Sequence, residues 1–234
     1  VRLSRTGYSG RPGEAPMPEL SVIAPCWGRP DAVRNLLEAL EAQDLPAETF
    51  EVVLVDDGSP APIEPATTGR DWRFDLTLVR QDNAGPAAAR NTALRHATGD
   101  IVLILNDDAV PEPHVLRGHL ELQRAWAGGP PRAALGRFDF RPEARAQRLL
   151  TRTLQDRDLL FMYHQAEPET DLDARFFWTC NLSLRRAELE AVGGFDERFR
   201  HPIMEDTDLG RRLERHRGLK VRYQPELGCW HDHE

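Results

Sequence analysis

Residues 101–108 read Ile-Val-Leu-Ile-Leu-Asn-Asp-Asp, five apolar residues that end at once in an amide and two carboxylates. The same arrangement occurs at 51–59, where Glu-Val-Val-Leu-Val precedes Asp-Asp-Gly-Ser, and at 20–29, where Leu-Ser-Val-Ile-Ala precedes Pro-Cys-Trp-Gly-Arg. Short, nearly continuous apolar runs are typical of strands that a parallel sheet buries on both faces. Three strands are therefore predicted, and each ends in a polar cluster. A further strand is predicted over 76–79.

Helical segments alternate with these strands. Residues 31–43 carry apolar side chains at helical spacing, residues 86–97 are rich in alanine, and a helix is predicted over 112–126. The alternation predicts an α/β fold with a single Rossmann-like, mostly parallel central sheet and helices on both faces. Because ligands of such sheets bind beyond the carboxyl ends of the strands, the three polar clusters are expected on one rim.

The pattern changes after the Gly-Gly-Pro-Pro stretch at 128–131. We interpret this change as a new role within one fold rather than a linker between domains. The remaining elements are predicted as a strand over 133–140, a long helix over 142–164, a strand-like stretch over 176–184, a helix over 205–216, a short strand over 220–223 and an extended piece over 228–231.

Composition excludes several classes of protein. The 234 residues carry a formal net charge of −8, which disfavours tight binding to a nucleic acid backbone. The apolar runs fall short of the roughly 20 residues of a membrane helix, so no transmembrane segment is predicted in this chain. Residues 1–17, rich in Gly, Pro and Arg, are predicted to be a disordered leader.

The three cysteines, Cys26, Cys180 and Cys229, are widely spaced and form no zinc-binding pattern. An odd number of such cysteines fits a reducing compartment, and we expect a cytoplasmic protein. A peripheral position at the inner face of the membrane, through another segment or a partner, is left open.

Two of the polar clusters suit the binding of a phosphorylated ligand. The Asp-Asp-Gly-Ser cluster at 56–59 could accept hydrogen bonds from a base or a ribose hydroxyl, and its alternative reading is a plain turn. The neighbouring carboxylates at 106–108 suit a hard divalent cation that bridges two phosphate oxygens. The alternative there is that Asp108 only leads into a turn before Pro111.

Three further features could carry chemistry. Arg90, in the alanine-rich helix, could reach back to the rim, or it could be a solvated residue of a packing helix. The acidic residues at 205–208 could supply a general base, or they could complement a helix dipole. Two histidines and two acids at 231–234 could bind a metal ion, although such tails are often simply solvated.

Taken together and in this order, the motifs resemble those of the inverting family 2 glycosyltransferases of the GT-A fold. The resemblance covers about 18–234 and rests on Ala24-Pro25, Val55 to Ser59, Asn83-x-Gly85, Ala89-Arg90-Asn91, Gly99-Asp100, Asn106-Asp107-Asp108, Asn181-x-Ser183, Gly193-Gly194-Phe195-Asp196, Glu205-Asp206-x-Asp208-Leu209 and His231.

The resemblance implies that residues 18–127 bind a nucleotide-diphosphate sugar donor and that residues 128–234 bind the acceptor and carry catalysis. Pro25 would lie by the base or ribose, and the base would be contacted by the acids at 56–57 and by the arginine of the alanine-rich helix. The donor-binding residues expected on this basis are Ala24, Pro25, Asp56, Asp57, Arg90 and Asp107.

The same resemblance implies a metal site and a base. Asp108 matches the last acid of the family's Asp-x-Asp motif, and His231 matches a late histidine that completes the metal site in some members. The expected cofactor is Mn²⁺ or Mg²⁺. Asn106 departs from the motif and removes one charge. Asp206 matches the catalytic base, with Glu205 beside it, and His233 is the alternative metal ligand.

The implied activity is metal-dependent inverting transfer of a sugar, with a UDP-sugar favoured, to a hydroxyl of a saccharide or lipid-linked acceptor. The setting would be polysaccharide, cell-envelope or glycolipid synthesis. The Gln-x-x-Arg-Trp motif of processive synthases is absent, which favours single transfers. Trp178 and Asn181 are the candidate acceptor residues, and the alternative for Trp178 is packing in the core.

Two other functions compete with this one. Asn106 supports a non-catalytic, nucleotide-sugar-binding regulatory protein. A sugar nucleotidyltransferase would share the nucleotide-binding sheet, but the residues at 25–29 lack its density of glycine. A receiver domain is excluded, because the Asp56-Asp57 pair follows the second predicted strand and the only lysine is Lys220.

Overall fold

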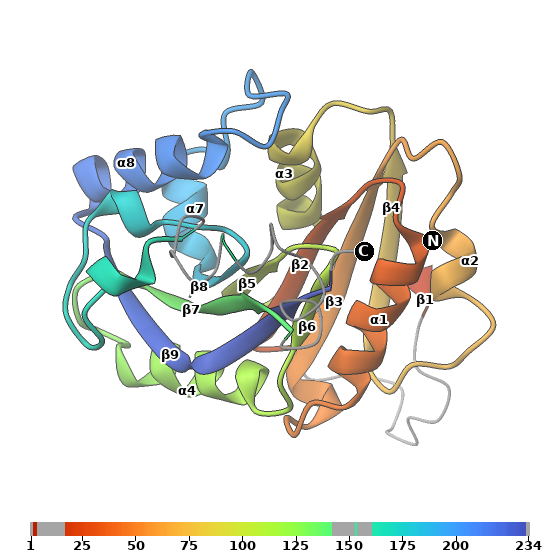
Figure 1. The fold of residues 1–234 in the computed structure, drawn as a ribbon, viewed down its shortest axis with the longest axis horizontal. Coiled ribbons are helices and arrows are strands. Elements are labelled where there is room, and N and C mark those ends of the chain that lie inside the picture. Colours follow the sequence, from red (N-terminus) through yellow and green to blue (C-terminus); the bar gives the residue numbers. More distant parts are fainter. Residues whose placement is uncertain (1, 4–16, 142–152, 154–160, 233–234) are drawn as a thin grey trace.

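The computed structural model describes residues 2–3, 17–141, 153 and 161–232. Over these residues the strands form one sheet in the order β1-β4-β3-β2-β5-β8-β7-β9-β6 (Figure 1). The strands are β1 (Arg2–Leu3), β2 (Leu20–Cys26), β3 (Phe50–Asp57), β4 (Asp75–Gln81), β5 (Ile101–Leu105), β6 (Ala109–Pro111), β7 (Arg132–Phe140), β8 (Asn181–Arg185) and β9 (Lys220–His231).

The centre of the sheet is parallel, as predicted. Strands β4, β3, β2 and β5 run in one direction, and the register pairs Cys26 at the end of β2 with Asp56 near the end of β3. Pro25 lies beyond the stretch of β2 that pairs with β5, so its missing N–H removes no hydrogen bond from that ladder. The three apolar runs therefore end at the same edge of the sheet.

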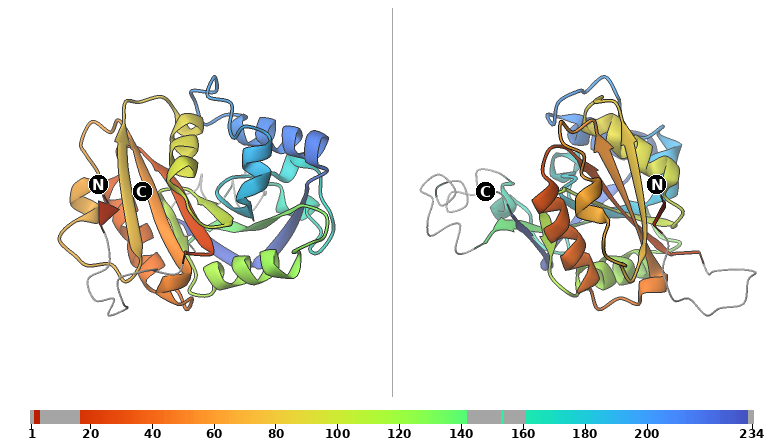
Figure 2. Two further views of the ribbon diagram at one scale, coloured as in Figure 1. Left: turned by 180° about the vertical axis from the view of Figure 1, so that it is seen from behind. Right: turned by 90° about the vertical axis from the view of Figure 1, so that its right-hand side faces the viewer.

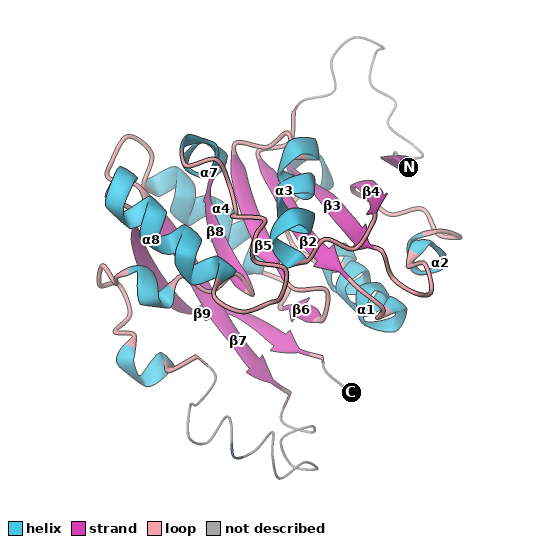
Figure 3. Cartoon of the chain, turned by 90° about the horizontal axis from the view of Figure 1, so that it is seen from above, coloured by secondary structure: helices cyan, strands magenta, loops and turns pink. Residues whose placement is uncertain are grey.

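Helices cover both faces of the sheet (Figures 2 and 3). Successive residues of a strand point to opposite faces, so Val22 packs in the core beneath α1 and α4, and Ile23 packs beneath α3 and α8. The helices are α1 (Pro30–Glu41), α2 (Glu64–Thr67), α3 (Pro86–His96), α4 (Val115–Ala125), α7 (Arg186–Ala191) and α8 (Glu205–Arg217).

The second half of the chain differs from the predicted elements in three places. The strand expected over 176–184 begins only at Asn181, because Ala174–Phe176 forms a 3₁₀ turn. The two pieces expected over 220–223 and 228–231 are one strand, β9, which an irregularity in the pairing opposite Gly136 and Arg137 allows. Strand β6 was not expected, since three residues are too few to show a periodicity.

Other expectations fall partly outside the described residues. Most of the helix predicted over 142–164 lies there, and Tyr163–Gln165 form a 3₁₀ turn. In the predicted leader, Arg2–Leu3 pair antiparallel with β4, and residues 4–16 lie outside the description. None of the helices that the structure describes has both the length and the apolar character needed to cross a membrane.

A buried polar network joins α4 to the middle of the sheet. His119 is fully buried, with Nδ1 2.9 Å from Ser183 Oγ and Nε2 2.9 Å from Asn181 Oδ1. The amide of Asn181 donates to the carbonyls of Arg137 and Leu227. Burial lowers the pKa of His119 to about 4 and outweighs the opposing hydrogen bond to Asn181, so the imidazole is neutral at pH 7.

This histidine makes the stability of the fold depend on pH. The unfolded chain takes up a proton on His119 near its ordinary pKa, whereas the folded protein does so only near pH 4. The free energy of unfolding should therefore fall by roughly 3 kcal/mol from this residue as the pH drops from 7 to 4. Urea unfolding of the parent and of His119→Gln at several pH values measures it, with exposed His216→Gln as control. Equal pH slopes for the parent and His119→Gln would contradict the assignment.

Candidate active site

The loops that follow β2, β3 and β5 meet at one rim of the sheet. The N–H of Gly28, after β2, donates to Ser59 Oγ at 2.8 Å, after β3. The N–H of Trp27 donates to Asp107 Oδ2 at 3.2 Å, after β5. The prediction that the three polar clusters share one rim is confirmed by these two hydrogen bonds.

Two buried carboxylates form the centre of this rim. The guanidinium of Arg29 makes ion pairs with both Asp107 Oδ1 and Asp108 Oδ2. His231 Nε2 lies 3.1 Å from the same Asp108 Oδ2. The side chains of Asp107 and Asp108 are only 4% and 3% exposed, so they are kept charged by these partners rather than by water.

The two carboxylates differ in their pKa. Burial raises the pKa of Asp107 to about 6, with Asp108 adding to the effect and Arg29 opposing it. Burial also acts on Asp108, but the hydrogen bond from His231 and the charge of Arg29 outweigh it, so the pKa of Asp108 falls below its ordinary value. Asp108 is therefore more fully ionised than Asp107 at neutral pH.

His231 reaches the rim from the far end of the chain because β9 pairs with β6. The register places His231 opposite Ala109, directly after the acids, and the N–H of Asp232 donates to the carbonyl of Asp108 at 2.9 Å. The imidazole packs against the rings of Phe138 and Phe140, with centroids 4.9 and 4.7 Å away. Asp108 and His231, 123 residues apart, are thereby held in contact.

The residues present fit a divalent cation that is shared with a ligand. Asp108 Oδ1 is buried and has no hydrogen-bond partner within the described part of the chain, which is costly unless a cation or a donor fills the position. Among the described residues, no cluster of three or more His, Cys, Asp or Glu side chains could hold a metal ion. A site with one carboxylate and one imidazole suits Mg²⁺ or Mn²⁺, which keep further positions for phosphate oxygens and water. His233 lies outside the described residues.

Asp56 and Asp57 organise the neighbouring loops. Asp56 accepts the N–H groups of Ser59 and Ile63 and pairs with Arg80. The oxygens of Asp57 accept the N–H groups of Ala84 and Gly85, at 2.9 and 2.8 Å. A Cβ on Gly58 would lie 2.7 Å from the backbone nitrogen of Asn83, so only glycine allows this close approach. Asp57 thus holds the end of β3 against the start of α3, whereas Asp56 holds the loop at 59–63 and Arg80 of β4.

Arg90 lies in a buried ion pair with Glu205. Its Nη1 is 2.8 Å from Glu205 Oε1, and the two side chains are 6% and 5% exposed. The guanidinium carbon also lies 5.4 Å from the centre of the Phe195 ring. The pair ties α3 in the first half of the chain to the first residue of α8 in the second.

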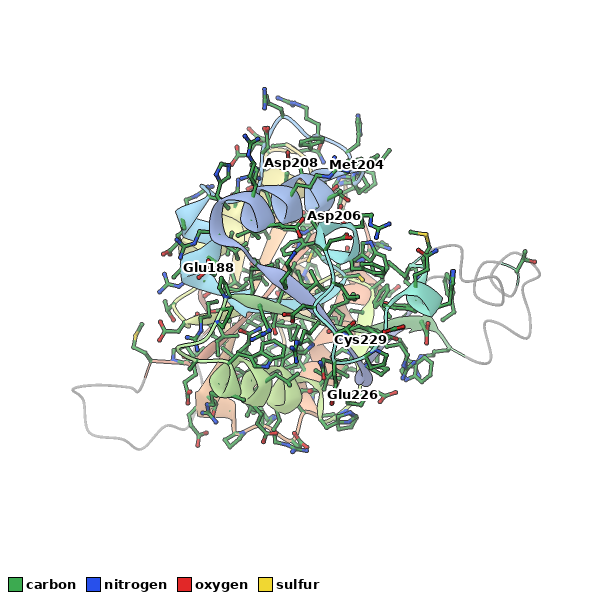
Figure 4. The ribbon with its side chains drawn as sticks, turned by 90° about the vertical axis from the view of Figure 1, so that its left-hand side faces the viewer. Glu188, Met204, Asp206, Asp208, Glu226 and Cys229 are labelled. Atoms are coloured by element: carbon green, nitrogen blue, oxygen red, sulfur yellow. The ribbon has the colours of Figure 1, made fainter. Side chains whose placement is uncertain are left out.

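Asp206 follows Glu205 on α8 and lies at the same rim as the acids after β5. Strands β5 and β8 pair Leu105 with Asn181, which places the preceding Cys180 at the carboxyl end of β5. Burial raises the pKa of the Cys180 thiol, and the charge of the Asp206 carboxylate adds to the shift. Figure 4 shows Asp206 on the side of α8 turned toward the sheet and Asp208 on the opposite side.

The environment of Asp206 suits a carboxylate that exchanges a proton. Burial, with the neighbouring Glu205 carboxylate, raises the pKa of Asp206, and the N–H of Thr207, 2.6 Å from Oδ1, opposes the shift. Met204 precedes the helix in a left-handed conformation (φ 70°), and its side chain is exposed. The start of α8 is thus a strained turn beside an open surface.

Four other candidate residues have different surroundings. Ala24 is fully buried within β2, whereas Pro25 is partly exposed at the rim. Trp178 is partly exposed and packs against the rings of Phe161, Tyr163 and Phe176. The expectation that Asn181 contacts the acceptor is corrected: its fully buried amide is bonded within the network of His119, because β8 is an interior strand.

Arg29 is a site residue whose role the sequence motifs did not predict. It stands at the end of the first polar cluster, but nothing in the residues at 25–29 indicates which acids it meets. Its contacts follow from the parallel pairing of β2 and β5, which brings residues 27–29 beside residues 106–108.

Solved structures share this fold. TarS from S. aureus superimposes with a TM-score of 0.70 and 20% identity, over 90% of this chain and 36% of that one. The mannosyltransferase PcManGT from Pyrobaculum calidifontis, solved with GDP-Man and Mn²⁺, gives a TM-score of 0.69 and 25% identity, over 92% of this chain and 57% of that one. The mixed α/β fold is thus the GT-A fold of glycosyltransferases, as the resemblance implied.

The sequence comparisons define the family. Residues 21–193 match the model of glycosyl transferase family 2, and the chain belongs to that family. Validoxylamine A glucosyltransferase of Streptomyces hygroscopicus subsp. jinggangensis is 29% identical over 228 residues, 86% of this chain and 52% of the relative. Pre-mycofactocin glycosyltransferase of Mycobacterium tuberculosis is 27% identical over an alignment of 246 residues, which includes the whole of this chain and 47% of the relative. The chain thus spans about half the length of these curated relatives.

The ion pair between the two halves should be important for stability. Arg90→Met leaves the Glu205 carboxylate buried without a partner and is expected to cost about 3–5 kcal/mol of unfolding free energy. Guanidinium unfolding measures the loss, and Arg95→Met, on an arginine of the same helix that is 63% exposed, is the matched control. Equal losses in the two variants would show that the pair does not join α3 to α8.

Proposed function

We propose that this protein is a metal-dependent, inverting glycosyltransferase that moves a sugar from a nucleotide-diphosphate sugar to an acceptor hydroxyl. Membership of glycosyl transferase family 2 supports the reaction class. The single observation that carries the proposal is the contact of Asp108 with His231 at the carboxyl ends of the parallel strands, with one carboxylate oxygen buried and unpartnered. The roles proposed for the cation, the general base, the nucleotide and the acceptor rest on the residues around that contact.

The cation would be held by Asp108 and His231 and by oxygens of the donor. When bound, Mn²⁺ or Mg²⁺ offsets the charge that develops on the departing diphosphate. The guanidinium of Arg29 also supplies positive charge to the buried carboxylates of Asp107 and Asp108. PcManGT, solved with GDP-Man and Mn²⁺, supports the use of a divalent cation.

Asp206 is proposed as the general base. A carboxylate with a raised pKa can take a proton from an acceptor hydroxyl near neutral pH. The acceptor oxygen then attacks the anomeric carbon opposite the diphosphate, so the configuration inverts and no covalent sugar–enzyme intermediate forms. Glu205 is proposed to keep the first turn of α8 in place through Arg90, rather than to exchange protons itself.

The nucleotide is proposed to bind beside Pro25 and the loops that Asp56 and Asp57 hold. A UDP-sugar is the favoured donor, and TarS has been solved in complexes with UDP and with UDP-GlcNAc. PcManGT, with GDP-Man, makes a GDP-sugar the alternative. Thermal unfolding with UDP, GDP and their sugars, each with and without Mn²⁺, distinguishes the two.

The acceptor is proposed to be a saccharide or a lipid-linked saccharide at the side of the rim formed by β7 and β9. The partly exposed ring of Trp178, fixed by Phe161 and Tyr163, could stack on a sugar. ExoW of Rhizobium meliloti, a succinoglycan biosynthesis protein, is 38% identical over 114 residues, 46% of this chain and 35% of the relative. This similarity supports a role in polysaccharide or cell-envelope synthesis.

Replacing the base should abolish turnover and leave donor binding intact. Asp206→Asn is expected to lower kcat about 10²–10⁴-fold, because a positioned general base contributes that much, with little change in the Kd for the donor. Asp208→Asn, two residues along α8 on its opposite face, is the control. Turnover of Asp206→Asn within a few-fold of the parent would remove this residue from the role of base. Binding of the donor without turnover in the parent would favour a non-catalytic binding protein.

Replacing the metal ligand should remove the effect of the cation. The parent is expected to unfold at a higher temperature with UDP and Mn²⁺ than with UDP alone, since a ligand that binds only the folded state stabilises it. Asp108→Asn should lose that difference. Asp139→Asn, on β7 and paired with Arg137, should keep it. A Mn²⁺-dependent shift that survives in Asp108→Asn would exclude this carboxylate as a ligand.

A further inference from the structure

Arg29 holds a position in the rim that a metal ion would also require. Its Nη1 pairs with Asp108 Oδ2 and its Nη2 with Asp107 Oδ1, so the planar guanidinium spans both carboxylates. His231 Nε2 bonds to the same Asp108 oxygen that Arg29 occupies. A cation held by Asp108 and His231 would therefore compete with the guanidinium of Arg29 for the negative charge of the Asp108 carboxylate.

The charges at the rim make this competition strong. Asp107 and Asp108 are buried side by side, and Arg29 neutralises one of their two negative charges. A divalent cation next to a retained guanidinium would be repelled, because like charges a few ångströms apart interact strongly in a partly buried site. Without the guanidinium, the two carboxylates would attract the cation more strongly.

The side chain of Arg29 is suited to leave this position, whereas the carboxylates are not. Arg29 is 41% exposed, against 4% and 3% for Asp107 and Asp108. It follows Gly28, which has a φ of 71° and open space where a Cβ would stand. Its guanidinium presents two parallel donors, which match a phosphate group as well as they match a carboxylate.

We propose that Arg29 is a positioning residue that exchanges partners during donor binding. In the donor-free protein it occupies the carboxylates and opposes entry of a divalent cation. When a nucleotide diphosphate binds with its cation, Arg29 moves from Asp107 and Asp108 to the diphosphate. This inference rests on the proposed function and deepens it, since it makes binding of the cation and of the nucleotide mutually dependent.

The exchange predicts opposite effects of one substitution on two affinities. Mn²⁺ alone should bind Arg29→Gln about tenfold more tightly than the parent, because the competing guanidinium is gone. At saturating Mn²⁺, UDP or GDP, whichever the parent binds, should bind Arg29→Gln about tenfold more weakly, because the contact with the diphosphate is lost. A residue that is merely structural would weaken both affinities or neither.

Electron paramagnetic resonance of free Mn²⁺ measures the first affinity, and calorimetric titration with the nucleotide measures the second. Arg34→Gln removes the same charge from an exposed position on α1 and should change each Kd by less than about twofold. Arg29→Lys keeps the positive charge but lacks the two parallel donors of the guanidinium. This variant should bind the nucleotide more weakly than the parent, and it should bind Mn²⁺ alone no more than a few-fold more tightly than the parent. Circular dichroism verifies that each variant is folded, and Arg29→Lys carries the test if Arg29→Gln is not.

Unchanged or weaker binding of Mn²⁺ alone by Arg29→Gln would overturn the competition. Unchanged nucleotide affinity in both Arg29 variants would overturn the move to the diphosphate. Failure of the proposed function is distinguishable, because it appears in the parent: no binding of UDP or GDP with Mn²⁺ in the parent would refute the donor site and this inference with it.

Discussion

Buried carboxylates at the carboxyl ends of β3 and β5 must be kept charged without water, and the arrangement of the rim depends on how each one is partnered. Asp56 and Asp57 are satisfied by backbone N–H groups and an arginine, so they fix loops. Arg29 contacts both Asp107 and Asp108, and His231 contacts Asp108, yet one oxygen of Asp108 has no hydrogen-bond partner among the described residues. This incompletely satisfied carboxylate is the one that we propose binds a cation.

The same constraint connects the two halves of the chain. Glu205 is buried at the start of α8, and its charge is acceptable only because Arg90 reaches it from α3. The start of α3 is in turn fixed by Asp57, and a Cβ on Gly85 would lie 2.4 Å from the carbonyl oxygen of Arg200, just before α8. A continuous set of contacts therefore runs from the end of β3, through α3, to the first turn of α8 that carries Asp206.

Much of the fold could be predicted because its central strands are buried on both faces. A continuous apolar run such as 101–105 has few other interpretations, and the polar residues that follow it mark its end. The prediction was poorer beyond residue 128. Strand β6 is too short to show a period, and the stretch before Asn181 is apolar because it is buried, although it turns as a 3₁₀ helix. The motif around Asn181 predicted a ligand-binding residue. The side chain is instead buried in an interior strand, where it stabilises the fold.

By itself, the sequence determined the parallel centre of the sheet, the rim at which its polar clusters meet, and the family to which the chain belongs, because these depend on local periodicity and on motifs in order. The tertiary structure alone decided which charges meet. The contacts of His231 with Asp108, of Arg29 with both acids and of Arg90 with Glu205 join residues about 80 to 120 positions apart. No local pattern encodes such pairs, because strand order and register set them.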